Sequence, residues 1–232
     1  MTLKENARLL RKRVAAAAQR AGRQSEDVRV IAVTKTVPVE TLRAAHALGF
    51  TIFGENRVQE AEEKIAALRE LDLRWELIGH LQTNKAARAL QLFNRIQSLD
   101  SLRLTETLNA RGRENSWVVP VLLEVNVAGE PSKTGFAPEE LREAARVVAD
   151  CGWLRAEGLM TVAPLTTDPE AARPHFRRLR ELRDELAEQA PLAQGEWREL
   201  SMGMTDDFEV AIEEGATIIR VGRALFGERP LA

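Results

Sequence analysis

The sequence predicts a closed (β/α)8 barrel preceded by one extra helix. Short β-branched runs alternate with amphipathic stretches along the whole chain, which is typical of parallel β/α units. Eight such units fit in 232 residues, close to the usual barrel size of about 250. A doubly wound open sheet also alternates strand and helix, but it seldom needs eight strands, and no G-x-G-x-x-G follows the first strand.

The extra helix is predicted from apolar residues that recur at helical spacing near the amino terminus. These are Leu3, Ala7, Leu10, Val14, Ala17 and Ala21, and Gly22 can end the helix. The eight strands are expected at 28–34, 51–53, 74–78, 95–98, 118–127, 154–160, 197–201 and 217–221. Helices are expected at 39–48, 56–70, 83–92, 101–114, 138–150, 168–189, 206–214 and 223–226, with Gly49 and Gly215 at helix ends.

Composition excludes several classes of protein. The net charge of −2 gives no electrostatic reason to bind nucleic acid or an anionic membrane. The one cysteine, Cys151, excludes an internal disulfide and fits the reducing cytoplasm. No apolar stretch reaches the roughly 18 residues of a membrane span, and the amino terminus does not read as a signal peptide. We see no interdomain linker, so residues 1–232 are expected to form a single domain.

Polar residues gather where the predicted strands end, which is where barrel enzymes build their sites. In chain order the strand ends carry Lys35, Glu55, Asn56, His80, Ser98, Glu124, Asn126, Met160, Ser201, Arg220 and Gly222. Lys35 ends the apolar run that forms the first strand. An amine half surrounded by apolar groups is desolvated, which favours its neutral form and makes it a nucleophile toward aldehydes. The alternative is an ordinary surface lysine that follows a strand.

The last two units carry a candidate phosphate site. Ser201 and Thr205 follow strand seven, and Gly222-Arg223 opens a one-turn helix after strand eight. Backbone N–H groups at such a turn bind anions, and a glycine allows close approach of a phosphate. A tight turn capped by serine is the alternative interpretation. A ligand with a phosphate, a flat ring and an aldehyde would use this turn, Arg220 and Lys35 together, and pyridoxal 5′-phosphate (PLP) has these parts.

Other polar and sulfur-containing residues receive structural interpretations. His46 and His175 lie within helices, and the histidines and the cysteine show no metal-ligand spacing. Asp206 and Asp207 are interpreted as helix-start residues. Met160, Met202 and Met204 are expected to pack the barrel mouth and the face of the cofactor. The Gly/Pro-rich stretch at 128–135 is expected to form a long loop on the carboxyl-terminal face, either a lid or an exposed connection.

The chain resembles the pyridoxal phosphate homeostasis proteins, a family related to the amino-terminal domain of alanine racemase. The shared motifs, in order, are VTKT (33–36), FGENRVQE (53–60), IGHLQTNK (78–85), EVNV (124–127), SKTG (132–135), GLM (158–160), LSMGMTDD (200–207) and RVG (220–222). The resemblance implies a barrel that carries PLP as an imine on Lys35, with Arg220 at the ring nitrogen and Asn56 nearby. It also implies that Ser201, Thr205 and the Gly222 turn hold the phosphate. One departure is Arg57, where the family often has tyrosine.

The strand-end residues and the family resemblance together predict one set of cofactor-binding residues. The set is Lys35, Asn56, His80, Ser98, Met160, Ser201, Met202, Thr205, Arg220, Gly222 and Arg223. Alanine racemases add a second domain and use a tyrosine as an acid/base group, whereas this chain ends soon after the last unit and contains no tyrosine. Losing a positioned acid or base typically costs about 10²–10⁴-fold in rate.

We therefore expect a non-catalytic carrier. It would hold PLP on Lys35, take part in intracellular PLP homeostasis, and pass the cofactor transiently to apo-enzymes. It is expected to be a monomer, because the racemase's reason to dimerise is absent. Two alternatives remain open. One is a slow amino-acid racemase with His80 or a water chain in the missing role, and the other is a phosphosugar lyase that uses Lys35 as a Schiff base.

Overall fold

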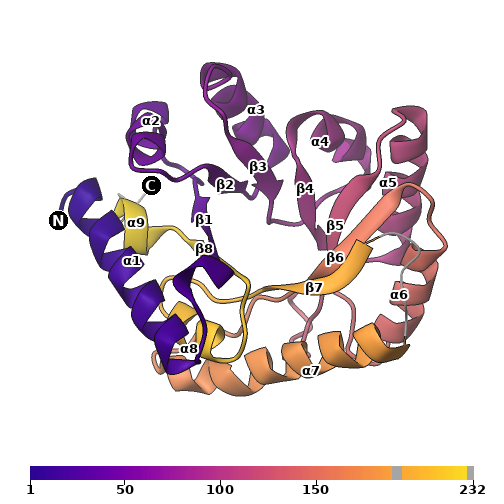
Figure 1. Cartoon of the computed structure of the whole chain (residues 1–232). Helices are drawn as coiled ribbons and strands as arrows, with labels where there is room; N and C mark the ends of the chain where they lie inside the picture. Colours follow the sequence, from indigo (N-terminus) through magenta and orange to yellow (C-terminus); the bar gives the residue numbers. More distant parts are fainter. Residues whose placement is uncertain (190–194, 229–232) are drawn as a thin grey trace.

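The computed structural model describes residues 1–189 and 195–228, and it confirms the predicted barrel (Figure 1). The eight strands pair in parallel in sequence order and close between β8 and β1. Their bounds are β1 Arg29–Val33, β2 Ile52–Glu55, β3 Arg74–Leu77, β4 Arg95–Leu99, β5 Val119–Glu124, β6 Leu154–Met160, β7 Gly195–Ser201 and β8 Ile218–Val221. All eight predicted strands are therefore present. The predicted domain of 1–232 extends over 190–194 and 229–232, which lie outside the described residues.

Helices surround the barrel and alternate with the strands. Their bounds are α1 Leu3–Arg20, α2 Val39–Ala47, α3 Val58–Ala67, α4 Ala86–Leu92, α5 Leu102–Glu114, α6 Leu141–Ala149, α7 Arg173–Gln189, α8 Phe208–Glu213 and α9 Arg223–Phe226. Short 3₁₀ turns span η1 Ser25–Asp27, η2 Thr83–Lys85 and η3 Pro169–Ala172. The predicted extra amino-terminal helix is α1, which begins with a capping box formed by Thr2 and Glu5.

Helix α1 packs against α8 and α9, at the point where the barrel closes (Figure 1). Arg13 pairs with Glu209 at 2.6 Å, and the Asn6 side chain donates a hydrogen bond to the carbonyl of Leu225 at 3.0 Å. These contacts fix α9 beside the end of β8. The extra helix therefore supports the last β/α unit from outside the barrel.

Several elements differ from the predicted bounds; for example, the helices predicted over 56–70, 83–92 and 138–150 are α-helical only from Val58, Ala86 and Leu141. The fifth strand was predicted over 118–127, but β5 ends at Glu124 because the Asn126 N–H bonds to the carbonyl of Phe136 in the following loop. The helix predicted over 168–189 begins as the 3₁₀ turn η3, capped by Asp168, before α7. The helix predicted over 206–214 begins only at Phe208, so Asp206 lies outside it and Asp207 is its N-cap.

The main apolar core lies between the strands and the helices, and a second, smaller cluster is separate from it. The smaller cluster contains Ile31, Leu122, Met160 and Ile218. Polar contacts also cross the barrel interior. Ser201 on β7 donates to Gln97 on β4 at 2.6 Å, and Gln97 donates to Glu76 on β3 at 2.6 Å. Because β4 and β7 are not neighbours in the sheet, the first of these bonds must pass through the barrel.

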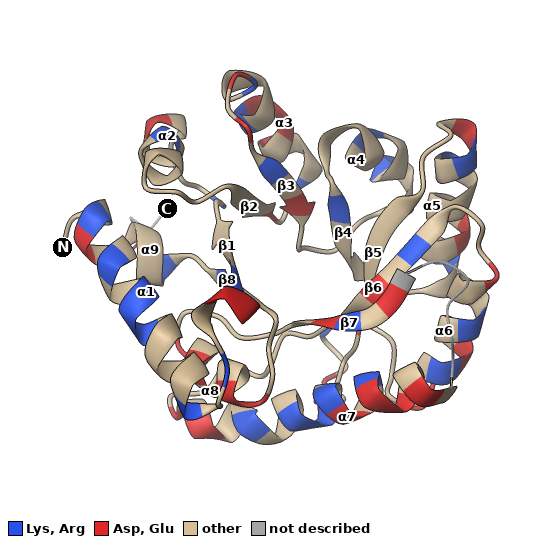
Figure 2. Cartoon of the chain, viewed as in Figure 1, with Lys and Arg blue, Asp and Glu red and all other residues tan. Residues whose placement is uncertain are grey.

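Charges of both signs alternate along α7, whereas α1 is mainly basic (Figure 2). Many of them are paired, for example Arg20 with Glu213 at 2.6 Å and Arg173 with Glu213 at 2.7 Å. Within residues 1–189 and 195–228, no helix combines the length and the apolar character that crossing a membrane requires.

Candidate functional site

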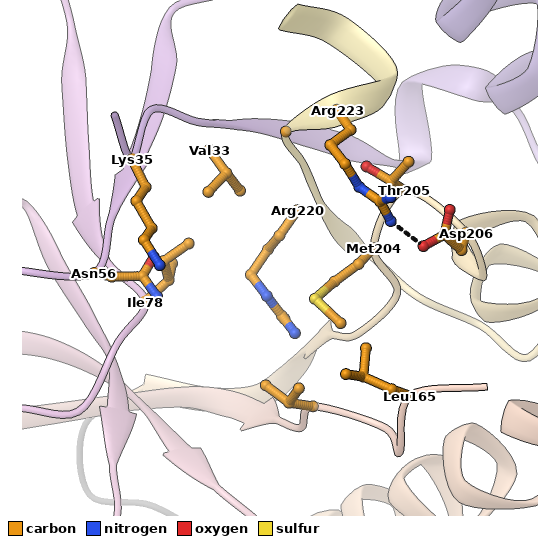
Figure 3. Close-up of a pocket in the computed structure, with 12 residues that line it drawn as sticks. Val33, Lys35, Asn56, Ile78, Leu165, Met204, Thr205, Asp206, Arg220 and Arg223 are labelled. Carbon is orange, nitrogen blue, oxygen red and sulfur yellow. Dashed lines mark hydrogen bonds and ion pairs between the residues drawn. The ribbon is translucent and has the colours of Figure 1, made fainter. Parts of the chain in front are cut away.

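A cavity of about 330 Å³ opens at the carboxyl-terminal end of the barrel (Figure 3). Its lining residues come from the ends of β1, β2, β3, β6, β7 and β8, as the strand-end argument predicted. They are Val33, Lys35, Asn56, Ile78, Val162, Leu165, Met204, Thr205, Asp206, Arg220, Gly222 and Arg223. The volume lies within the range of small-molecule sites, about 300–1,000 Å³.

Lys35 projects from the end of β1 into this cavity, beside Asn56 and Ile78 (Figure 3). The residue is partly buried. Among the residues that the structure describes, none accepts a hydrogen bond or forms an ion pair with its amine. A half-buried amine without a carboxylate partner is available to react with a ligand.

The backbone around Lys35 is held by a buried network behind the cavity. The ammonium of Lys64 on α3 donates to the carbonyl of Thr34 at 2.5 Å and to Glu55 and Glu60 at 2.6 and 2.7 Å. The Thr34 hydroxyl donates to Glu55 at 2.5 Å. Thr34, Glu55 and Lys64 are all buried, so the ammonium of Lys64 compensates the charge of Glu55 inside the protein.

The residue after Lys35 is held by the same network. Thr36 has a φ of 61°, a left-handed conformation that is uncommon outside glycine. Its backbone N–H donates to Glu60 at 2.5 Å, which fixes this conformation. Burial opposes ionisation of Glu60, but the hydrogen bonds from Lys64 and Thr36 outweigh it and lower the pKa of Glu60. The network therefore bonds to both neighbours of Lys35 and leaves its amine free.

Asn56 approaches the cavity because the loop after β3 lacks a side chain at Gly79. A Cβ at Gly79 would lie only 2.6 Å from the carbonyl oxygen of Asn56. Glycine thus allows the loops after β2 and β3 to touch, which places Asn56 and Ile78 in one wall. The close approach of Gly79 to Asn56 thus explains why Asn56 lies beside Lys35 in the cavity.

Arg220 extends between the two walls of the cavity (Figure 3). Its guanidinium donates to the Ser201 hydroxyl at 2.6 Å and to the carbonyl of Thr161 at 2.7 Å. Burial lowers the pKa of Arg220 to about 10, although the charges of Asp207 and Glu124 act in the opposite direction. The side chain is thus a rigid, deeply buried donor with one edge on the cavity.

The wall opposite Lys35 is formed by the turns after β7 and β8. The Thr205 hydroxyl accepts the backbone N–H of Ala224 at 3.3 Å, which joins the two turns. Gly203 has a φ of 90°, and a Cβ there would lie 2.5 Å from the Cβ of Ala211, so this turn requires glycine. Asp206 and Arg223 form an ion pair at the rim.

His80 lies outside this cavity but lines an adjoining one together with Lys35 and Asn56. Its Nδ1 lies 2.6 Å from a carboxylate oxygen of Asp100, whose side chain is only 6% exposed. This contact orients the ring. Nearby, Glu124 is buried, which raises its pKa, and one of its carboxyl oxygens has no partner among the described residues.

The cavity thus brings together six of the residues predicted from sequence: Lys35, Asn56, Thr205, Arg220, Gly222 and Arg223. The other five lie outside its lining. Ser201 is buried behind Arg220, Ser98 donates to the carbonyl of Gly79 at 2.7 Å, and Met202 belongs to the main core. Met160 packs in the smaller cluster, and His80 lines the adjoining cavity.

Sequence reasoning did not assign Val33, Ile78, Val162 and Leu165 to the site, and it treated Asp206 as a helix-start residue. Isolated apolar residues near strand ends give no signal that separates a cavity wall from a core. In the structure Asp206 lies before the N-cap of α8 and pairs with Arg223. Met204 lines the cavity, in agreement with its predicted place at the mouth.

The loop at 128–135 follows β5 and borders a second cavity lined by Glu124, Asn126, Ser132, Lys133, Thr134 and Val162. The Asn126 amide donates to the carbonyl of Glu130 at 2.8 Å, and the Lys133 amine donates to Glu130 at 2.9 Å. The loop therefore lies on the carboxyl-terminal face, as predicted, and is closed by its own polar contacts.

Comparison with known proteins gives consistent results. The family model for the alanine racemase N-terminal domain matches residues 5–230. The chain is 46% identical to the pyridoxal phosphate homeostasis protein of Aquifex aeolicus, over 94% of both chains. It is 42% identical to the protein of the same name from Pseudomonas aeruginosa, over 98% of this chain and 96% of the relative. The structure of PipY from Synechococcus elongatus with PLP bound is similar at 38% identity and a TM-score of 0.81, covering 92% of this chain and all of PipY.

Proposed function

The chain belongs to the pyridoxal phosphate homeostasis proteins, within the alanine racemase N-terminal domain family, and we propose that it binds PLP as a Schiff base on Lys35. In this proposal the protein takes part in intracellular PLP homeostasis without strong catalysis of its own. It acts as a cytoplasmic monomer and passes the cofactor to apo-enzymes by transient contact.

One observation carries the proposal. The unpaired amine of Lys35 lines the same cavity as Thr205 and Gly222, which lie in the turns after β7 and β8. Lys35 would supply the bond to the aldehyde carbon. Thr205 and the backbone N–H groups at Gly222 and Arg223 would donate to the phosphate, and the cation of Arg223 adds favourable charge there. PipY binds PLP and shares 38% of its residues with this chain, which supports the same ligand here.

Arg220 supports binding without strong catalysis. It lies between Lys35 and the β7–β8 turns, where the ring of the ligand would sit. PLP promotes catalysis by withdrawing electrons through a protonated ring nitrogen. A guanidinium beside that nitrogen disfavours its protonation, so the bound ring is a weaker electron sink. Ser201 and the Thr161 carbonyl position Arg220, and Ser201 would therefore act on the ligand through it.

A slow amino-acid racemase is the second candidate, and the His80–Asp100 pair is the observation that favours it. Asp100 orients the imidazole of His80 at 2.6 Å beside the cavity that Lys35 shares. A histidine oriented in this way can act as a general acid or base. The chain contains no tyrosine to supply an alternative group.

Two measurements test the proposed function. Purified protein loaded with PLP should activate an apo-PLP enzyme, and the Lys35→Ala variant should lose this activity as a donor. Exchange of the α-proton of alanine in deuterated water should stay close to the rate with free PLP. Rapid exchange that disappears in Lys35→Ala and in His80→Gln would contradict the carrier and establish the racemase.

A further inference from the structure

The adjoining cavity that His80 lines has a volume of about 640 Å³ and is also lined by Lys35. It is bordered by the start of α3 and by the segment between β3 and α4. The side chains that matter here are Lys35, Arg57, His80 and Lys85, with Gln59 and Gln82 between them. We call it the basic cavity. Lys35 and Asn56 line both this cavity and the proposed PLP site, so the two spaces adjoin at these residues.

The basic cavity is lined by three cationic side chains that form no ion pair with a carboxylate among the described residues. Across the described residues, the side chains of Lys35, Arg57 and Lys85 make no hydrogen bond or ion pair. None of the residues that line the cavity is acidic. The arginines of α1 and α7 differ, since Arg20 and Arg173 are held by Glu213.

The carboxylates of adjoining segments are already engaged. Glu60 on α3 bonds to Lys64 and to the N–H of Thr36, although it also interacts electrostatically with Arg57. Asp100 is occupied by His80 and by the hydroxyl of Ser101. A concave space lined by unpaired cations attracts anions, because its low-dielectric walls concentrate the field.

We propose that the basic cavity binds the carboxylate of small α-amino acids whose amino group exchanges with Lys35. This role rests on the proposed function, because it places the exchange at the PLP-bearing amine. In an α-amino acid a single carbon separates the amine from the carboxylate, so a carboxylate brought to Lys35 must lie in one of the two adjoining cavities. The proposed PLP site is filled by its ligand and carries Asp206, whereas the basic cavity carries Arg57 and Lys85.

The exchange is balanced without any further reactant. The incoming nitrogen forms the new C=N bond, the C=N bond to Lys35 breaks, and the two hydrogens of the incoming amine pass to the Lys35 nitrogen. Arg57 and Lys85 hold the carboxylate and take no part in bond formation. Binding through two cations also selects amino acids over amines that lack the carboxylate.

The first arm of the test uses the loaded protein and two amines that differ only by the carboxylate. Loss of the Lys35-bound absorbance is followed after mixing with alanine or with ethylamine. The double variant Arg57→Gln/Lys85→Gln should slow the reaction with alanine about tenfold, as expected for lost charge-assisted contacts, and leave ethylamine unchanged. Arg74→Gln is the matched control, since Arg74 is exposed at the opposite end of the barrel.

The second arm needs no PLP. N-acetylalanine, a carboxylate without a free amine, is titrated into the apo-protein while the side-chain amide signals of Gln59 and Gln82 are followed by NMR. These signals should shift on binding, and the double variant should bind about tenfold more weakly. The proposal is overturned if the double variant binds N-acetylalanine like the parent, or if it slows both amines equally. If no Lys35-bound absorbance forms but N-acetylalanine still binds through Arg57 and Lys85, the proposed function fails and the carboxylate site stands.

Discussion

The two walls of the proposed PLP site hold their cations in opposite ways. On the β1–β3 side, Lys64 and its carboxylate partners fix the backbone on either side of Lys35, and the reactive amine itself has no partner. On the β7–β8 side, the side chain of Arg220 is itself fixed by Ser201 and Thr161. A reacting side chain needs a fixed backbone and a mobile end, whereas a side chain that orients a ligand needs a single conformation.

The sharpest contrast is between two lysines of the first wall. Lys64 has three acceptors in a buried network, and Lys35 has none. We therefore expect one lysine to contribute chemistry and the other to contribute stability. Each of the following predictions tests whether these roles can be separated.

The largest expected effect is complete loss of covalent PLP retention in Lys35→Ala. No other amine lines the proposed PLP site, so gel filtration should leave only trace cofactor on the variant. Because the Lys35 amine makes no bond, the free energy of unfolding should change by no more than about 0.5 kcal/mol. Absorbance of the filtered protein and urea denaturation measure the two quantities, with Lys12→Ala on the exposed face of α1 as the control. Stoichiometric retention by Lys35→Ala would assign the bond to another group.

Lys64→Met, in contrast, should cause a large loss of stability. It leaves the carboxylates of Glu55 and Glu60 without their cation, and Glu55 is fully buried. Removing one partner of a buried ion pair costs about 3–5 kcal/mol of unfolding free energy. Urea denaturation should detect this loss, while Lys12→Met should leave stability unchanged. A cost below 1 kcal/mol in Lys64→Met would mean that the network does not hold the Lys35 backbone.

Ser201→Ala tests the second wall with a smaller expected effect. Arg220 loses one of its two acceptors, and Gln97 loses a donor, so unfolding should become about 1–3 kcal/mol easier. PLP affinity should fall about fivefold, because Arg220 is no longer held in one conformation. The bond to Lys35 should still form.

Thr105→Val is the matched variant for that experiment, because it removes a buried hydroxyl that donates to the carbonyl of Ser101 at 3.0 Å, away from the cavity. It should lower stability by a similar amount and leave PLP affinity unchanged. Equal affinity losses in both variants would show that Ser201 acts through general stability alone.

The smallest expected effect is a pH dependence from Glu60. Its pKa is lowered in the folded protein, so the unfolded chain binds more protons below about pH 4.5, the ordinary value for glutamate. The stabilisation by Glu60 is thus present above that pH and is lost as pH falls through the folded pKa. In urea denaturation between pH 5 and pH 3, Glu60→Gln should lose stability less steeply than the parent. Identical slopes would mean that its bonds to Lys64 and Thr36 add no stability.

The fold and half of the proposed site could be read from the sequence because both follow from strand ends. Alternating β/α units define the barrel, and Lys35, Asn56, Thr205 and Gly222 lie within four residues of a strand end. The same rule could not separate Ser201 from Thr205. Both lie at the carboxyl-terminal end of β7, but the hydroxyl of Ser201 is turned toward Gln97 and Arg220. This direction depends on how strands on opposite sides of the barrel face each other.

The network behind Lys35 could not be predicted for a related reason. Lys64 lies in a helical pattern that reads as an ordinary charged surface, and its three acceptors come from β1, β2 and the first turn of α3. Only the packing of α3 against β2 brings these groups together. The unpaired cations of the basic cavity could not be predicted either, because the sequence does not reveal which cationic side chains form ion pairs with carboxylates.

The proposed attachment of PLP to Lys35 can be tested by chemical trapping. Protein loaded with PLP is reduced with borohydride, digested, and mapped by mass spectrometry. We expect one pyridoxyl group for each chain, on the peptide that contains Lys35. A pyridoxyl group found on Lys64, Lys85 or Lys133 in place of Lys35, or no group at all, would contradict it.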